Sequence, residues 1–101
     1  MTITTTREND RVTLTLSGWL DTLSAPELGA AVDEIHEAAA IILDFEAVEY
    51  IASSGLRQVV ACYRRAKELG ATLSIINATT ETMSIFELTG IDKKLDIRRK
   101  E

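Results

Sequence analysis

A short, continuously apolar run, Ile41–Leu43, lies near the middle of this 101-residue chain. Such runs are typical of central strands that are covered on both faces, and we expect Asp44 to end this one. A stripe of apolar residues at helical spacing follows it, formed by Leu56, Val59, Val60, Tyr63 and Ala66. Because a buried strand followed by an amphipathic helix is the repeating unit of α/β folds, this order favours that class.

The segments before this unit predict two further strands and a helix. Val12, Leu14 and Leu16 alternate with hydroxyl residues, which is the period of a strand with one buried face, and residues 2–6 predict a shorter partner strand. Ser24–Glu27 has the spacing of a capping box with proline in the first turn. The helix that it predicts places its apolar residues at helical intervals: Leu28, Ala31, Val32 and Ile35.

The segments after it continue the alternation. Leu69–Gly70 is expected to close the central helix, since glycine commonly follows the last helical turn. Residues 71–76 predict a strand, residues 80–88 a third helix and residues 95–97 a final edge strand. We therefore expect one α/β domain over residues 1–101, with a mixed sheet of about five strands and about three main helices.

The charge distribution argues against a nonspecific nucleic-acid binder, because the formal net charge is −5 and such binding needs basic surface. No Lys or Arg lies between Arg11 and Arg57, whereas the later part of the chain is rich in both. This polarity would steer a basic partner, or it would only keep the protein in solution. The N-terminus lacks the apolar core of a secretory signal and no apolar run is long enough to span a bilayer, so we expect a cytoplasmic protein without membrane insertion.

The residues that most enzymes or metal sites require are scarce. His36 is the only histidine, and Cys62 is the only cysteine and lies within an apolar helical pattern that predicts a structural, buried thiol. One histidine and one cysteine cannot supply a typical zinc ligand set. No Gly-x-Ser-x-Gly elbow and no phosphate-cradling glycine loop occur. We therefore expect neither catalysis nor a cofactor nor a metal ion.

The paired hydroxyls of Ser53 and Ser54 stand between the central strand and the central helix. Serine side chains at this position commonly cap the first free N–H groups of a helix. The same N–H groups and the helix dipole also favour a phosphate, so a phosphoserine would be stable there. The residues alone leave both interpretations open.

The segments around these serines contain a series of motifs along the chain: Leu16–Gly18, Leu20–Asp21, Asp44–Phe45, Val48, Tyr50–Ile51, Ser53–Leu56 and Leu88–Ile91. In the order and spacing of these motifs, nearly the whole chain resembles the STAS family of anti-sigma factor antagonists. One position departs from the family's pattern, because Ala52 stands where the family usually has an Asp before the first serine.

The resemblance implies a phosphorylation switch. By position Ser53 corresponds to the family's phosphoacceptor, with Ser54 beside it as a capping neighbour. The implied partners are an anti-sigma factor with serine kinase activity, which binds the unphosphorylated protein, and a protein serine phosphatase, which reverses the modification. Gly55 belongs to the same turn, and Asp21 matches an acidic residue that helps to engage the kinase, although an ordinary turn residue would also fit there.

Two more residues are expected in the partner-binding surface. Trp19 lies at the end of a predicted strand, where it is either an exposed interface anchor or part of the core. Arg57 follows Ser53 by four residues, which places it within reach of a phosphate on that serine.

Two other functions remain as alternatives. The chain would serve as a STAS interaction subunit of another complex, such as a lipid-transport ATPase, with the serines acting only as a helix cap. An enzyme with Ser53 as nucleophile is disfavoured by the missing base and oxyanion site.

Overall fold

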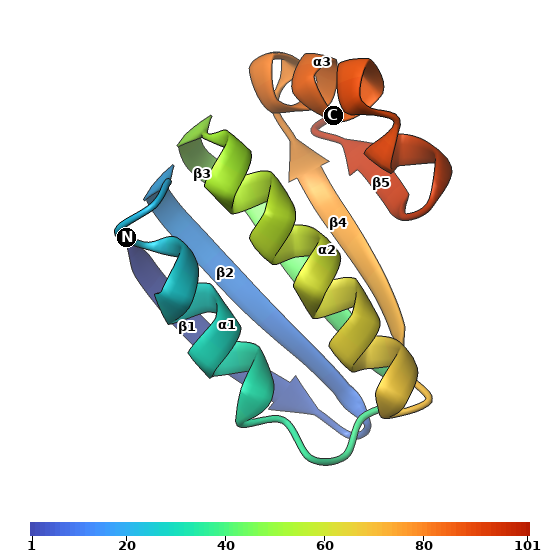
Figure 1. Ribbon diagram of the computed structural model, residues 1–101. Coiled ribbons are helices and arrows are strands. Elements are labelled where there is room, and N and C mark those ends of the chain that lie inside the picture. The colour runs from blue at the N-terminus through green and yellow to red at the C-terminus, as the bar shows by residue number, and fades with distance from the viewer.

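The computed structural model describes residues 1–101, and strands alternate with helices along the chain (Figure 1). In chain order the elements are β1 (Thr2–Glu8), β2 (Arg11–Leu20), α1 (Ala25–Asp33), β3 (Ala40–Ile51), α2 (Ser53–Glu68), β4 (Thr72–Ala78), α3 (Thr80–Thr89), the short 3₁₀ helix η1 (Ile91–Lys93) and β5 (Asp96–Arg99). The five strands form one sheet in the order β1-β2-β3-β4-β5. β1 is antiparallel to β2 and every other pair is parallel, so the predicted mixed α/β sheet with three main helices is confirmed.

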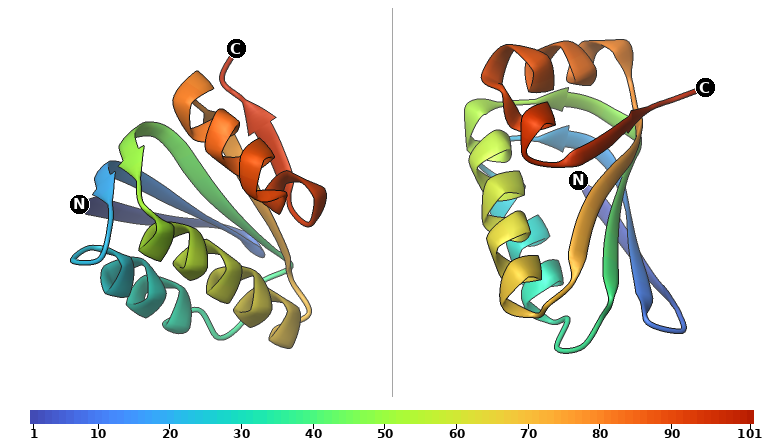
Figure 2. Two further views of the ribbon diagram at one scale, coloured as in Figure 1. Left: turned by 45° about the horizontal axis from the view of Figure 1, so that its top comes forward. Right: turned by 90° about the vertical axis from the view of Figure 1, so that its right-hand side faces the viewer.

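The hydrophobic core lies on one face of this sheet. Successive side chains of a strand point to opposite faces, and the buried residues in the first half of β3 fall on one of them: Ile41, Leu43 and Phe45. α1 and α2 cover this face (Figure 2), and Phe86 of α3 packs against Phe45 with ring centroids 5.7 Å apart. The prediction that the central strand is covered on both faces is wrong, because Ile42 on the opposite face pairs with Thr13 and Ser74 and is only half-buried.

β3 is also longer than the sequence predicted, since Asp44 lies within the strand instead of ending it. The strand continues because Phe45, Val48 and Ile51 are all buried in the core. Their spacing departs from strict alternation, and the pairing of β2 with β3 shifts register twice along this stretch. These irregularities are typical of β-bulges, which interrupt the two-residue alternation by which a strand is recognised in a sequence.

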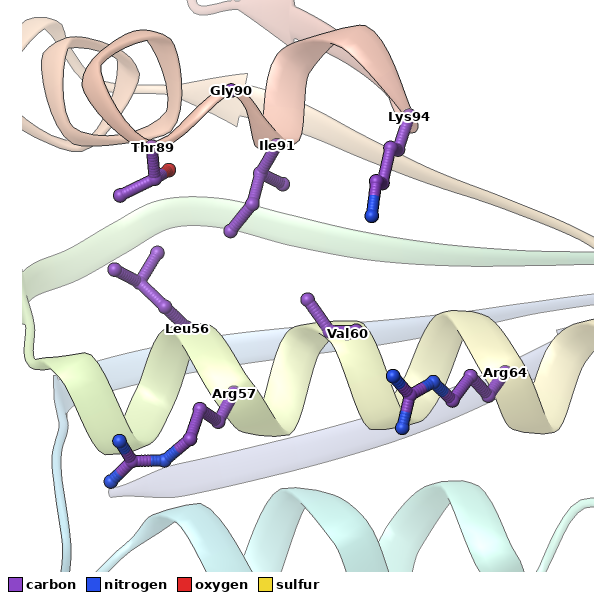
Figure 3. A pocket seen from close by; sticks show the side chains of 8 residues that line it. All are labelled: Leu56, Arg57, Val60, Arg64, Thr89, Gly90, Ile91 and Lys94. Atoms are coloured by element: carbon purple, nitrogen blue, oxygen red, sulfur yellow. The ribbon is translucent and has the colours of Figure 1, made fainter.

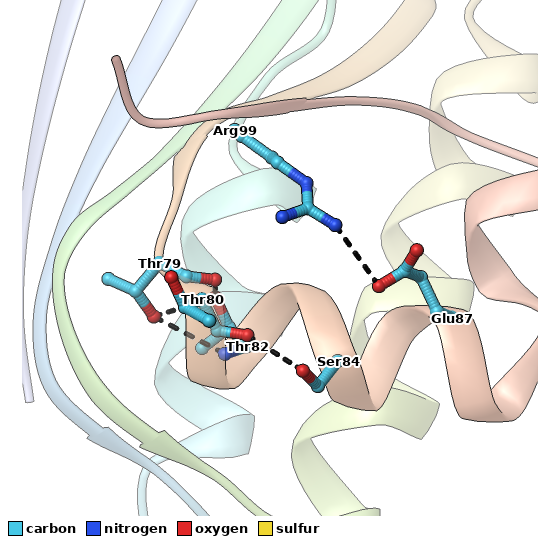
Figure 4. A network of polar contacts seen from close by, with 6 residues as sticks. All are labelled: Thr79, Thr80, Thr82, Ser84, Glu87 and Arg99. Atoms are coloured by element: carbon cyan, nitrogen blue, oxygen red, sulfur yellow. Dashed lines mark hydrogen bonds and ion pairs between the residues drawn. The ribbon is translucent and has the colours of Figure 1, made fainter.

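The C-terminal end of α2 and the N-terminal end of α3 are capped in different ways. α2 ends where the sequence predicted, with Leu69 as its C-cap and Gly70 at φ +73°, a left-handed conformation that favours glycine. α3 begins with a side-chain cap, because the backbone N–H of Thr82 donates to Thr79 Oγ1 at 3.3 Å (Figure 4). On the same helix, Glu87 pairs with Arg99 of β5 at 3.3 Å, which ties the last strand to α3.

Candidate interaction site at the start of helix α2

Helix α2 begins immediately after β3, and no side chain caps it. Ala52 is the N-cap residue, with φ −92° and ψ 172°, and the helix starts at Ser53. A side-chain cap requires a residue with an extended backbone and a side-chain oxygen. Ala52 has the extended backbone but no side-chain oxygen, whereas both serines have the oxygen but already lie within the helix. The prediction that Ser53 or Ser54 caps this helix is therefore wrong. The first backbone N–H groups of α2 keep no intrahelical or side-chain acceptor.

The two serine hydroxyls differ in their surroundings. Ser53 is exposed, and its hydroxyl makes no hydrogen bond within the chain. Ser54 is half-buried, and its Oγ accepts a hydrogen bond from Thr22 Oγ1 at 3.1 Å. Of the two, Ser53 is the hydroxyl that an incoming enzyme can reach without breaking an internal contact.

Gly55 holds the start of α2 against the end of β2. A Cβ atom at this position would lie 2.6 Å from the carbonyl oxygen of Leu20 and 3.0 Å from Cγ1 of Ile51. The same Leu20 oxygen accepts the backbone N–H of Ala52 at 2.9 Å. Gly55 is itself buried, so it positions the two serines and offers no surface of its own.

The turn after β2 is organised by Asp21. Its Oδ1 accepts hydrogen bonds from the backbone N–H groups of Leu23 at 3.0 Å and Ser24 at 3.1 Å. The N–H of Ser24 makes the largest contribution to lowering the pKa of the Asp21 carboxyl below its ordinary value. Asp21 therefore has the role of a turn residue, and its carboxylate also brings a negative charge near α2, because the turn contacts Ser54 through Thr22.

The predicted capping box at Ser24 does not form. Ser24 is the N-cap residue of α1, but its side chain makes no cap hydrogen bond. Its Oγ instead accepts the N–H of Asp21 at 2.9 Å and donates to the carbonyl oxygen of Trp19 at 2.6 Å. The Ser24 hydroxyl therefore stabilises the preceding turn and does not accept a backbone N–H of α1.

An exposed apolar patch, formed by Trp19, Leu23 and Tyr50, borders this turn. Trp19 is 57% exposed, Tyr50 47% and Leu23 88%. Trp19 and Tyr50 are register partners on β2 and β3, and their rings contact each other with centroids 5.2 Å apart. The interpretation of Trp19 as an exposed residue is confirmed, and its alternative as a core residue is wrong. Large apolar side chains gathered on a surface mark interaction sites.

Sequence reasoning missed Leu23 and Tyr50 as members of this patch. Tyr50 is found only through the register that sets it opposite Trp19, and a register across two bulges is not visible in the sequence. Leu23 lies in an irregular turn, where no periodic pattern separates buried from exposed residues.

Arg57 lies one turn further along α2 and is exposed. It takes part in none of the three ion pairs of the chain. The start of α2 thus brings together Ser53, Ser54, Gly55 and the Asp21 turn. Trp19 lies beside that turn, and Arg57 stands at the margin. The roles of these residues in partner binding remain predictions.

Cys62 and His36 are the remaining side chains with nucleophilic or metal-binding chemistry. Cys62 is buried as predicted, and burial raises the pKa of its thiol to about 11. His36 is exposed, and no group of three or more His, Cys, Asp or Glu side chains is arranged to hold a metal ion. None of the helices combines the length and the apolar character that crossing a membrane requires.

Comparisons with known proteins agree with this architecture. Residues 3–98 match the family model described as "Mlab, STAS domain". The anti-sigma-B factor antagonist of Bacillus subtilis is 29% identical over 94 residues, which are 92% of this chain and 85% of that protein. An anti-sigma factor antagonist from Mycobacterium paratuberculosis has the same fold, with a TM-score of 0.86 at 24% identity over 96% of this chain and 84% of that one. The Bacillus cell fate determinant SpoIIAA in its phosphorylated form gives a TM-score of 0.74 at 18% identity over 95% of this chain and 90% of that one.

Proposed function

This chain belongs to the STAS domain family, and we propose that it acts as an anti-sigma factor antagonist whose binding is switched off by phosphorylation of Ser53. The partner is an anti-sigma factor with serine kinase activity, and a protein serine phosphatase restores the binding form. The named relatives support the antagonist role. The observation that carries the switch is the exposed, unbonded Ser53 at the uncapped start of α2.

The apolar patch supplies the attraction for the partner. Tryptophan and tyrosine are enriched among the residues that dominate binding energy, because they bury much area with few rotatable bonds. Trp19 and Tyr50 already contact each other in the free protein, so docking does not need to order them separately. Leu23 belongs to the turn that contacts Ser54 through Thr22, and in the proposed complex the partner covers this turn and the start of α2 together with the patch.

A phosphate on Ser53 opposes that docking while leaving the free protein stable. It adds a charge of roughly −1.5 to −2 at neutral pH. In the free protein the uncapped N–H groups and the dipole of α2 stabilise this charge. In a complex the charge would lose its water near the turn that carries the ionised Asp21, and removing an ion from water carries a large penalty. The modification therefore weakens the complex without unfolding the domain.

Ala52 changes the local chemistry of this switch but keeps the turn ordered. An Asp at the N-cap would itself accept the first N–H groups of the helix and would repel a phosphate. With alanine there, these N–H groups are left for the phosphoryl oxygens. The turn keeps its shape because Ala52 N–H donates to Leu20 O and Gly55 packs against the same atom.

The test compares four forms of the protein: wild type, Ser53→Asp, Ser53→Asn and Ser54→Ala. Each is immobilised and exposed to lysate of the native host, and bound proteins are identified by mass spectrometry. We expect wild type, Ser53→Asn and Ser54→Ala to capture a kinase-type anti-sigma factor, and Ser53→Asp to lose it, because only aspartate adds charge. The captured kinase and ATP should place phosphate on Ser53. Phosphate on Ser54 alone, or undiminished capture by Ser53→Asp, would contradict the assignment.

A second candidate is a STAS interaction subunit of another complex, such as a lipid-transport ATPase, without a phosphorylation switch. One observation favours it: Ala52 replaces the Asp that antagonists of the family usually have before the first serine. Equal capture of a transporter ATPase by all four forms would establish this alternative.

A further inference from the structure

A groove of about 430 Å³ lies between α2 and the segment that joins α3 to η1 (Figure 3). Its apolar centre is formed by Leu56 and Val60 of α2, which point toward Ile91 of η1. Leu56 and Val60 are half-buried, so part of this apolar surface remains open to solvent. The volume falls within the range of roughly 300–1,000 Å³ that is usual for small-molecule sites.

Cationic side chains surround this apolar centre, and no acidic residue lines the groove. Arg57 and Arg64 come from α2, and Lys94 reaches in from the opposite wall, facing the end of the groove where Arg64 lies (Figure 3). None of the three belongs to an ion pair, since the chain's ion pairs are Arg98–Asp96, Arg99–Glu87 and Lys100–Glu46. In a chain of net charge −5, this is a local excess of positive charge without an internal partner.

We propose that the groove binds a small anionic amphiphile, a carboxylate or phosphate group carried on an aliphatic chain. The anionic head lies between Arg64 and Lys94, where a guanidinium and an ammonium approach from the two walls and donate charge-assisted hydrogen bonds. The aliphatic chain lies along Val60, Ile91 and Leu56 and buries the apolar surface that the free protein leaves open. This proposal does not rest on the antagonist role.

The length of the apolar strip decides between a small ligand and a partner helix. Leu56 and Val60 are four residues apart, which is about 6 Å along a helix. A helix bound in a groove uses anchors over at least two turns, or about 10 Å. The strip therefore holds a short aliphatic chain but is too short for the apolar face of a helix.

The test is a titration of the full, ¹⁵N-labelled chain followed by amide chemical shifts. Octanoate and octyl phosphate are the ligands, 1-octanol is the uncharged control and acetate is the control without a chain. We expect saturable shifts at Val60, Gly90 and Ile91 with octanoate and octyl phosphate, and at least tenfold weaker binding of 1-octanol and acetate. Comparing the two ligands shows whether the carboxylate or the phosphate head is preferred.

Variants test the position of the head group. Arg64→Ala and Lys94→Ala should each weaken octanoate binding by roughly tenfold, as expected for loss of one charge-assisted hydrogen bond. Arg98→Ala, which removes a cation outside the groove, is the matched control and should bind like wild type. The proposal is overturned if neither anionic ligand shifts the groove amides, or if 1-octanol binds as tightly as octanoate. It is also overturned if an acidic amphipathic peptide shifts these amides when octanoate does not. The comparison of the four ligands uses wild-type protein alone, so it tests the proposal even if a variant fails to fold.

Discussion

Gly55→Ala tests whether the close approach of α2 to β2 positions the serines. The added Cβ would lie 2.6 Å from the carbonyl oxygen of Leu20 and 2.8 Å from Cγ of the same residue. Because the nearest atom belongs to the backbone of a buried strand end, no side-chain rotation relieves the contact. The start of α2 must move away from β2, and the hydrogen bond from Ala52 N–H to Leu20 O is strained with it.

The expected net loss is about 1–2 kcal/mol of the free energy of unfolding. Overpacking a buried contact costs roughly 1–3 kcal/mol. Replacing glycine by alanine in a helix returns up to about 1 kcal/mol through helix propensity and the smaller entropy of the unfolded chain. For a domain of this size, the net loss corresponds to a Tm lower by roughly 4–16 °C.

The assay is urea denaturation followed by far-UV circular dichroism, with Gly29→Ala as the matched control. At position 29 the added Cβ meets only the end of the Gln58 side chain, with Nε2 at 2.8 Å, and this flexible group moves at little cost. Gly29→Ala should therefore be as stable as wild type or more stable by up to about 1 kcal/mol, because it has the same gain from helix propensity without the backbone contact. If Gly55→Ala proved as stable as Gly29→Ala, the contact with Leu20 would not hold the helix start and this reasoning would fail.

Three further predictions concern other parts of the chain. Thr79→Ala should lower the free energy of unfolding by about 1 kcal/mol in the same assay, because the cap on Thr82 N–H is lost. The folded-state pKa of Asp21 is lowered by the N–H of Ser24, so its contribution to stability is present above the unfolded pKa and lost as pH falls through the folded pKa. Stability measured from pH 7 to pH 3 should therefore fall less in Asp21→Asn than in wild type. Cys62, with its pKa raised to about 11 by burial, should react with a thiol reagent at pH 8 only after urea unfolds the chain.

The elements of the fold were predictable where the pattern was periodic. The alternation of β2 corresponds to a buried face in the structure. The predicted stripe of α2 is buried only at Val59 and Ala66, since Leu56, Val60 and Tyr63 are half-buried. The end of β3 was not predictable, because register shifts let Phe45, Val48 and Ile51 all face the core. Local pattern also failed to show that the opposite face of the sheet is open, since Ile42 is apolar but pairs with two hydroxyl residues.

The proximity of the segments that form the candidate site was predictable from the sequence, but their contacts were not. Motif order placed Ser53, Asp21 and Trp19 in one region, and the structure brings their segments together through the contacts at Gly55 and Ser54. The hydroxyls of Ser24 and Ser54 were expected to cap helices, yet both are engaged with the turn after β2. Capping motifs indicate which residues can accept a backbone N–H, whereas tertiary contacts decide which of them do so.

The position of Trp19 gives the protein a built-in optical probe. It is the only tryptophan of the chain and it is 57% exposed beside Tyr50. In the free protein its emission should be that of a water-contacting indole, and a partner that covers the patch should shift the emission toward shorter wavelength. Association can therefore be followed without a label. The same emission reports little about unfolding of the core, because the indole is already exposed to solvent in the native state.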